Sequence, residues 1–492
     1  MIPVLICGAG AAGLALAIEL ARRKVPFRLV EKSDGPFPGS RGKGLQPRSQ
    51  EVFEDMGVVD RLFACGEPYP TVRQHHADGT WTDTAIGGAG PTPSEPYTQA
   101  LLVPQFETER VLRERLAELG HRVEYGCELR GFSQDESGVE ASLATAAGEE
   151  TVRCAWLVGT DGGRSVVRQA LAIEFPGKTL GVRAVVADVV LTGLARDAWH
   201  RFNDDDMQRQ VSLCPLAGTD LFQLQAPVPM AGDVDLGATG LGEMVRTRTG
   251  RDDLAVESVR WASAYTMNAR LADRYRVGRV FLVGDAAHVH PPTGGQGLNT
   301  SVQDAYNLGW KLAAVVAGAP ASLLDSYEAE RRPIAADMLG LSTRLLDAAR
   351  RGEMKRGRDV QQLDLGYFDS PLNVASAHPA EVRVQPGQRA PDARVTGAAG
   401  QRRRLFDLFA GVHWTLLGLA TSADAVTPRA GLRVHVAGPR GDLRDDAGQL
   451  ADAYGLRPGD WVLVRPDGYV AAVVATPELP AIDALLERVG LG

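Results

Sequence analysis

The sequence has few cysteines and no long apolar segment. Its 492 residues include 5 cysteines, and none are spaced as CxxC, so neither a disulfide framework nor a zinc site is expected. No apolar run reaches the roughly 20 residues that a membrane helix needs. The chain opens on the apolar run Ile2–Cys7, without the basic segment of a secretory signal. We therefore expect a cytoplasmic protein that binds no metal and enters no membrane.

An excess of basic residues is also missing. The chain has 53 Lys and Arg against 61 Asp and Glu, for a net charge of -8. Proteins that bind nucleic acid usually carry a basic face, and anionic membranes attract basic segments, so neither partner is expected. The length predicts two or three domains.

The first 31 residues predict a strand, a helix and a second strand. Val4–Cys7 is a continuous apolar run, as expected for a strand buried on both faces of a parallel sheet. The run ends in Gly8-Ala9-Gly10-Ala11-Ala12-Gly13. Gly8 permits a tight turn, Gly10 lets a pyrophosphate approach the backbone, and Gly13 lets helix and strand pack closely. The phosphates would meet the free N–H groups at the helix start.

Glu31 ends the second strand. A carboxylate there can accept hydrogen bonds from a ribose diol, which favours FAD or NAD over NADP as the tightly held nucleotide. A glycine-rich turn alone is weak evidence. With both strands, the helix and Glu31 in place, dinucleotide binding is favoured over a simple turn.

Two more segments follow apolar strands. Val152–Val158 leads into Asp161-Gly162, where an ordinary turn is an open alternative. Val280–Val283 leads into Asp285 and then the loop Pro291–Asn299, which opens a helix. An Asp at the end of a strand can bind a polyol hydroxyl, and N–H groups at a helix start can face negative charge.

These three segments, in this order, resemble the class A flavoprotein monooxygenases, the family of para-hydroxybenzoate hydroxylase and phenol hydroxylase. The similarity is greatest to aromatic polyketide hydroxylases and rifampicin monooxygenase-like enzymes, and it covers roughly residues 1–350. The resemblance implies FAD as cofactor, NADPH or NADH and O2 as co-substrates, and hydroxylation of an aromatic, polyketide-type small molecule through a C4a-hydroperoxyflavin. The protein supplies binding and orientation, and the flavin supplies the redox chemistry.

The same resemblance implies a cofactor site. Glu31 would hold the adenosine ribose, Gln105 would lie beside the ribityl-pyrophosphate, and Asp285 would bind the ribityl chain. N–H groups from about Gly297 to Asn299 would face the flavin's pyrimidine edge. The full set is Gly8, Gly10, Ala11, Ala12, Gly13, Glu31, Lys32, Arg41, Arg48, Gln105, Asp161, Gly162, Asp285, Pro292, Gly295, Gly297, Leu298 and Asn299.

A catalytic base is not evident. His288 and His290 flank the loop, and a hydrogen-bonded structural role is expected for each. Candidates to line a substrate pocket are Phe222, Met230, Trp261, Tyr265 and Pro291. Apolar residues of a sheet are more often plain core.

The predicted fold is α/β, with three parts. A Rossmann-type FAD-binding domain spans residues 1–174 and 279–385. A mostly antiparallel sheet domain that binds the substrate is inserted at 175–278. Residues of about 70–103 could join this inserted domain. Residues 386–492 resemble the thioredoxin-like C-terminal domain of phenol hydroxylase relatives. All five cysteines precede that domain, which excludes dithiol chemistry there. The charged stretch 350–358 is expected to be solvated surface or a mobile connection.

Several alternatives stay open. The same fold could serve a Baeyer–Villiger oxygenase or an epoxidase acting on a polycyclic substrate, or a flavin-binding regulator without turnover. A flavin halogenase is disfavoured because the chain has no Trp-x-Trp-x-Ile-Pro segment. A monomer and a homodimer are both compatible with the sequence.

Overall fold

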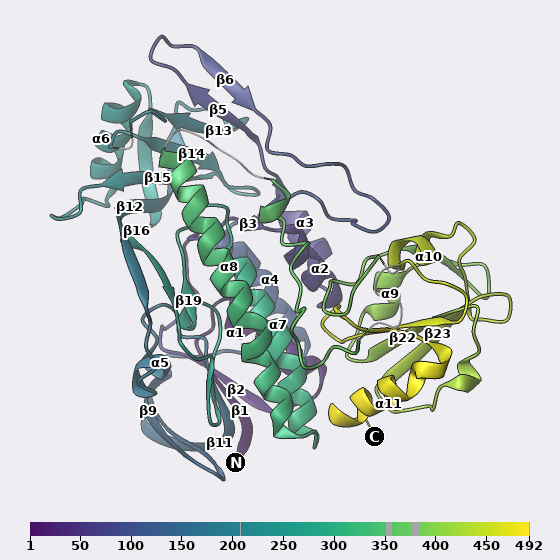
Figure 1. Cartoon of the computed structure of the whole chain (residues 1–492). Helices are drawn as coiled ribbons and strands as arrows, with labels where there is room; N and C mark the ends of the chain where they lie inside the picture. The colour runs from purple at the N-terminus through teal and green to yellow at the C-terminus, as the bar shows by residue number, and fades with distance from the viewer. Residues whose placement is uncertain (207, 351–356, 376–382, 492) are drawn as a thin grey trace.

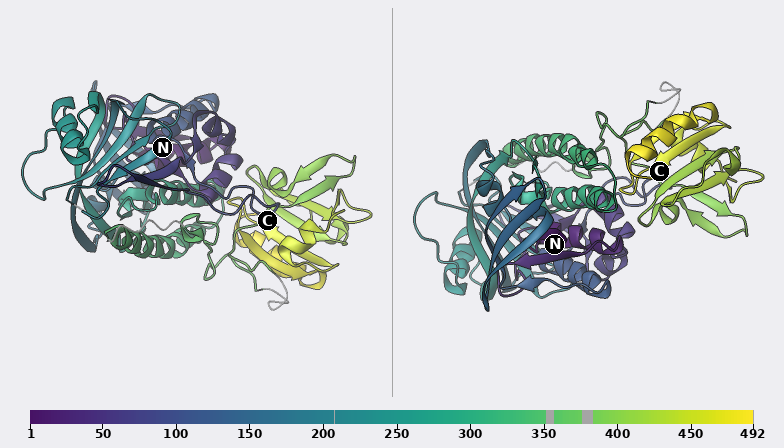
Figure 2. Two further views of the ribbon diagram at one scale, coloured as in Figure 1. Left: turned by 90° about the horizontal axis from the view of Figure 1, so that it is seen from above. Right: turned by 90° about the horizontal axis from the view of Figure 1, so that it is seen from below.

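The computed structural model describes residues 1–206, 208–350, 357–375 and 383–491. Two large sheets and the helices α7 (Gly297–Val316) and α8 (Asp325–Arg350) form the main body, and the C-terminal part lies to one side of it (Figures 1 and 2). The charged stretch predicted at 350–358 falls mostly on residues 351–356, outside the described part. No helix in the described part is both long enough and apolar enough to span a membrane.

The first sheet is built around strand β1, whose apolar side chains are buried on both faces. Its strand order is β17-β18-β11-β1-β2-β8, and the pairs from β18 to β8 are parallel, as the βαβ pattern predicts. Strands β9 and β10 extend β11 as an antiparallel hairpin. The strands are β1 (Ile2–Cys7), β2 (Phe27–Glu31), β8 (Glu124–Tyr125), β9 (Glu128–Asp135), β10 (Gly138–Thr145), β11 (Gly148–Gly159), β17 (Arg276–Val277) and β18 (Val280–Leu282).

The second sheet has the order β19-β16-β12-β15-β14-β13-β5-β6. Its pairs are antiparallel except for β13 with β5, so the prediction of a mostly antiparallel sheet is confirmed. The strands are β5 (Thr71–His75), β6 (Trp81–Thr84), β12 (Gly177–Thr192), β13 (Ala198–Phe202), β14 (Val211–Pro215), β15 (Leu221–Val228), β16 (Ala255–Leu271) and β19 (His288–Val289).

Helix α6 (Ala238–Thr249) lies within the region predicted to be a mostly antiparallel sheet domain, and the sequence did not predict this helix. Leu241 and Val245 lie one turn apart and pack on the apolar back of the second sheet, beside Phe222 and Leu224. That stripe is short, and Gly240 and Gly242 weaken the local helix propensity. The helix forms because it covers the sheet.

Helix α1 (Ala11–Arg22) packs on strands β1 and β2 of the first sheet, and the helices α4 (Gln105–Glu118) and α7 pack against α1. Helix α7 packs against α1 and α8 (Figure 1). Its polar side is buried as well as its apolar side, including Gln303, Asp304 and Lys311. Helices α2 (Pro47–Asp55), α3 (Val59–Cys65) and α5 (Val166–Ala170) and the small sheet of β3 (Gly44–Leu45), β4 (Glu67–Pro68) and β7 (Leu101–Leu102) complete this part.

The C-terminal part has its own seven-stranded sheet, ordered β21-β20-β24-β23-β22-β25-β26, and an apolar core of its own. A second apolar cluster joins it to the main body, where Trp310 packs with residues of this sheet. The C-terminal part also meets the main body through buried ion pairs between Arg465 and Glu330. Its elements are β20 (Arg394–Gly397), β21 (Arg402–Arg404), α9 (Leu405–Phe409), β22 (Trp414–Leu419), β23 (Leu432–Ala437), β24 (Leu443–Arg444), α10 (Gln449–Tyr454), β25 (Asp460–Val464), β26 (Val470–Ala475) and α11 (Leu479–Arg488).

Candidate cofactor and substrate site

One cavity of about 1470 Å³ lies between the two large sheets, and all three predicted segments line it. It is lined by predicted cofactor residues from each segment: Gly8, Gly10, Ala11, Ala12, Glu31, Lys32, Arg41, Gln105, Asp161, Gly162, Asp285, Pro292, Gly295, Gly297 and Leu298. Segments more than 270 residues apart therefore meet around one space, because β1, β11 and β18 end at the same edge of a parallel sheet.

The glycines at the start of α1 are required by close backbone contacts. Gly8 has a φ of +108°, and a Cβ there would lie 2.4 Å from the carbonyl oxygen of Thr160. A Cβ at Gly13 would lie 2.0 Å from the carbonyl oxygen of Gly8. Gly13 does not line the cavity; it lets α1 approach the strand end, as its place in the motif predicts.

Two carboxylates, those of Glu31 and Glu109, line the cavity near the start of α1. Glu31 Oε2 accepts from the N–H of Ala9 at 3.0 Å, and Oε1 accepts from the hydroxyl of Ser33 at 2.8 Å. Glu109 was not predicted, although it follows Gln105 by one helical turn on the same face. Gln105 Nε2 donates to Glu109 Oε1 at 2.8 Å, and burial raises the pKa of Glu109 to about 6.

Arg168 connects the segment at Asp161-Gly162 with the segment at Gly284-Asp285 through hydrogen bonds. The sequence did not predict a role for this residue. The Arg168 guanidinium donates to the carbonyl oxygens of Ala286, at 2.8 Å, and Gly163, at 2.9 Å. Asp161 Oδ2 accepts from the N–H groups of Val166 and Val167 at the start of α5. Its Oδ1 is buried without a hydrogen-bond partner, so only one of the two carboxylate oxygens is used in capping the helix.

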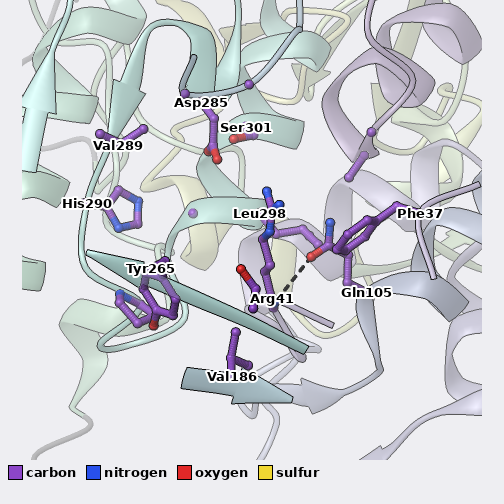
Figure 3. Close-up of a pocket in the computed structure, with 18 of the residues that line it drawn as sticks. Phe37, Arg41, Gln105, Val186, Tyr265, Asp285, Val289, His290, Leu298 and Ser301 are labelled. Carbon is purple, nitrogen blue, oxygen red and sulfur yellow. Dashed lines mark hydrogen bonds between the residues drawn. The ribbon is translucent and has the colours of Figure 1, made fainter. Parts of the chain in front are cut away.

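Asp285 follows β18 and its side chain is exposed within the cavity. Figure 3 shows it beside Ser301, with Tyr265 and Val186 on the opposite side of the space. Gly284 precedes it with a φ of +64°. Its N–H donates to Asp304 Oδ2 at 3.2 Å, which holds the turn that presents Asp285.

The loop Pro291–Asn299 is anchored by Asn299. Its side chain accepts from the N–H of Gln46 at 2.8 Å and donates to the carbonyl oxygens of Gly44 and Gly295 at 2.8 and 2.7 Å. Asn299 itself is buried and is not among the residues lining the cavity. Its side chain therefore shapes the loop.

The two histidines differ. His288 is fully buried and bonds to Asp304 at 2.8 Å, as the structural interpretation predicts. Although burial opposes it, Arg331 and His288 hold the pKa of Asp304 below its usual value. His290 lines the cavity; its Nδ1 lies 3.0 Å from the carbonyl oxygen of Pro291, and its Nε2 is buried without a partner. The predicted role of His290 as a hydrogen-bonded structural residue therefore holds for Nδ1 and not for Nε2.

Tyr265 and Pro291 line the cavity, but three other substrate candidates do not. Side chains alternate along a strand, so Gln223 and Gln225 face the cavity while Phe222 packs under α6. Met230 is exposed on the loop after β15. Trp261 packs against Phe37, with ring centroids 5.2 Å apart.

Arg48 does not reach the cavity, contrary to the prediction. Its guanidinium donates to Glu51 Oε2 and to the carbonyl oxygen of Asp467, both at 2.8 Å, and lies 4.9 Å from the ring centre of Tyr469. The resemblance to the flavoprotein monooxygenases had placed Arg48 at the cofactor. Helix α2 turns the side chain toward the C-terminal part.

Two family models cover most of the chain. Residues 1–342 match the FAD binding domain, and residues 383–489 match the aromatic-ring hydroxylase C-terminal domain. The chain belongs to the FAD-dependent aromatic-ring hydroxylases. The resemblance seen in the sequence is therefore confirmed.

Relatives of this chain span nearly its whole length. It is 39% identical to a flavin-dependent monooxygenase of Mycobacteroides abscessus, over 96% of both chains. It is 36% identical to the 6-methylpretetramide 4-monooxygenase of Streptomyces rimosus, over 95% of this chain and 90% of the relative. A solved complex of aklavinone-11 hydroxylase with FAD and aklavinone matches with a TM-score of 0.85 and 28% identity, over 99% and 98% of the two chains. The chain is accordingly a flavin-dependent monooxygenase.

The cavity fits FAD. Gly8 and Gly10 leave bare backbone at the start of α1, the buried Asp161 Oδ1 has no hydrogen-bond partner, and Asp285 presents a carboxylate to the cavity. These are the donors and acceptors that a dinucleotide with a polyol chain requires.

Proposed function

We propose that this monooxygenase hydroxylates an aromatic, polyketide-type small molecule, with NADPH or NADH and O2 as co-substrates. The observation that carries the proposal is the single cavity that has the three cofactor segments on one side and the second sheet on the other. One space can then hold the flavin nucleotide and a substrate against it. Bound FAD supplies the chemistry, by taking a hydride from the nicotinamide and activating O2.

The residues have proposed roles in holding that cofactor. The start of α1 faces the pyrophosphate, Glu31 binds the adenosine ribose, and Asp285 binds the ribityl chain. The start of α7, at Gly297 and Leu298, faces the flavin's pyrimidine edge, where a helix N-terminus stabilises negative charge by about 0.3–1 kcal/mol. Arg41 and Gln105 complete the cofactor wall.

The cavity lining contributed by the second sheet supports the proposal of a polycyclic substrate. Val186, Ala184 and Tyr265 give it an apolar floor. Burial raises the pKa of Tyr265 to about 12, so its hydroxyl stays protonated near neutral pH. Two relatives carry names of multi-ring substrates, 6-methylpretetramide and aklavinone.

The test is an absorbance spectrum of the purified protein, followed by NAD(P)H consumption with a panel of phenols and aromatic polyketides. We expect bound FAD and consumption that a polycyclic phenol accelerates at least tenfold. No acceleration across the panel would contradict the proposal. Product analysis separates the alternatives, because hydroxylation gives a phenol, whereas Baeyer–Villiger chemistry gives an ester and epoxidation gives an epoxide.

The C-terminal part has a proposed thioredoxin-like architecture. Its central strands β22 and β23 are parallel, and β25 and β26 follow antiparallel on one side. It has no cysteine, so we propose a structural role. The five unpaired thiols elsewhere fit a reducing, cytoplasmic setting.

A further inference from the structure

A row of side chains crosses the second sheet on the face that lines the cavity. Arg201 on β13 pairs with Ser212 on β14, which pairs with Gln225 on β15. Gln225 pairs with Val186 on β12, which pairs with Ser263 on β16. All five line the cavity, so the sheet presents an apolar floor at Val186 and a polar end toward Arg201.

Lys43 lies at this polar end of the second sheet, although it comes from the segment before β3 and not from that sheet. Its Nζ donates to Gln223 Oε1 at 2.6 Å and lies 4.4 Å from the ring centre of Trp199. Gln225 Nε2 donates to the same oxygen at 2.8 Å. Lys43 is only 8% exposed, yet it lines the cavity.

The backbone on either side of Lys43 contacts the flavin segments. The N–H of Gly42 donates to Gln105 Oε1 at 3.2 Å, and the carbonyl oxygen of Gly44 accepts from Asn299 at 2.8 Å. The ammonium group is therefore held between the cofactor side and the substrate side of one space.

The charges around this end are mostly positive. Every acidic residue among the described lining residues comes from the segments at the cofactor side, and the second sheet contributes Arg201 and Arg270 but no carboxylate. Arg201 pairs with Asp204 at 3.0 Å. Asp188, on β12, lies near Lys43 and Arg260. It is fully buried and does not line the cavity, and burial raises its pKa to about 6.

We propose that Lys43, with Gln225 and Ser212, forms an oxyanion subsite that binds the substrate through an ionised phenol or enol oxygen. The inference rests on the proposed function and names the substrate class as acidic aromatic compounds. On binding, the phenol O–H releases its proton to solvent, and the oxygen anion lies against the ammonium. An ammonium in a site sheltered from water stabilises an anion far more than it does in bulk water. The phenolate is also the more electron-rich form of the ring, which electrophilic hydroxylation favours.

The experiment uses 4-nitrophenol, whose anion absorbs differently from the neutral phenol. It is titrated by pH on the FAD-loaded enzyme without NAD(P)H, and difference spectra give the pKa of the bound phenol. We expect that pKa to lie at least one unit below the value in water, and Lys43→Met to abolish the decrease, a change of at least tenfold in the ionisation constant. Lys43→Arg should retain part of it, because the charge remains.

Two controls separate an electrostatic role from a packing role. Lys178→Met removes an exposed lysine of β12 that does not line the cavity, and it should leave the bound pKa unchanged. The neutral ether 4-nitroanisole should bind wild type and Lys43→Met equally. An unchanged pKa of bound nitrophenol in Lys43→Met, or no binding of nitrophenol up to its solubility limit, would overturn the subsite. Neither result depends on turnover. The titration therefore tests the subsite independently of the NAD(P)H consumption that tests the proposed function.

Discussion

Arg465 and Glu330 form a double ion pair across the junction between the C-terminal part and α8. The Nη1–Oε1 distance is 2.7 Å and the Nη2–Oε2 distance is 2.9 Å, and both side chains are fully buried. Lys311 of α7 donates to the same carboxylate at 2.6 Å, and Asp467 bonds to Arg465. The junction is a closed cluster of two cations and two anions.

Breaking this cluster should strongly destabilise the protein. Arg465→Met leaves Asp467 without its bidentate partner and the cluster with an excess negative charge, so we expect the free energy of unfolding to fall by about 3–5 kcal/mol. Urea denaturation followed by circular dichroism measures the change. The exposed Arg444 provides a matched control, because Arg444→Met should cost less than about 0.5 kcal/mol. Equal stability of Arg465→Met and wild type would show that the cluster contributes nothing.

Removal of the Asp285 carboxylate should weaken FAD binding. Asp285 faces the cavity, whereas Asp273 is exposed outside it. We expect Asp285→Ala to purify nearly colourless and to bind added FAD at least tenfold more weakly, a loss of about 1.4 kcal/mol. Asp273→Ala should purify with full FAD. Stoichiometric FAD in Asp285→Ala would refute the assignment.

The amide of Asn299 should be needed for the shape of the flavin loop. Asn299→Ala leaves the N–H of Gln46 and two carbonyl oxygens without their partner, and each unsatisfied buried group costs about 1–3 kcal/mol. We expect weaker FAD binding by tenfold or more, measured by flavin fluorescence. Asn299→Asp should be equally harmful, because a carboxylate would face the carbonyl oxygens of Gly44 and Gly295. Wild-type affinity in Asn299→Asp would mean that the two donated bonds are dispensable.

Glu109 should make the apoprotein less stable as pH rises. Its pKa is raised by burial from 4.5 to about 6, so between these values the folded state binds more protons than the unfolded state. Stability then falls with rising pH through this window, by up to ~2 kcal/mol, and the loss is complete above about pH 6. Glu109→Gln cannot titrate, so it should gain on wild type by this amount between pH 4.5 and pH 7 in urea titrations. A constant difference at all pH values would argue against the raised pKa.

Much of the cofactor side could be predicted from the sequence because its causes are local. Gly8 and Gly13 are dictated by contacts between neighbouring backbones, and Glu31 and Asp285 follow directly from the strands that end beside them. The parallel order of those strands follows from the βαβ pattern. Once three strands end at one edge, their following residues must converge.

The substrate side depended on long-range packing. Whether Phe222 or Gln223 faced the cavity depended on which face of β15 the helix α6 covers, and a shift of one residue would reverse the answer. The family resemblance assigned Arg48 to the cofactor, but the C-terminal turn at Asp467 and Tyr469 binds it instead.

By itself, the sequence determined the dinucleotide-binding βαβ unit, the three cofactor segments and the antiparallel character of the second sheet, because glycine conformation and side-chain periodicity act over a few residues. Only the tertiary structure decided that Lys43 reaches Gln223 and Trp199, that Arg168 joins two motifs, and that Arg465 closes a buried cluster with Glu330. Those contacts join residues up to 180 positions apart, and their geometry is set by how whole sheets and helices pack.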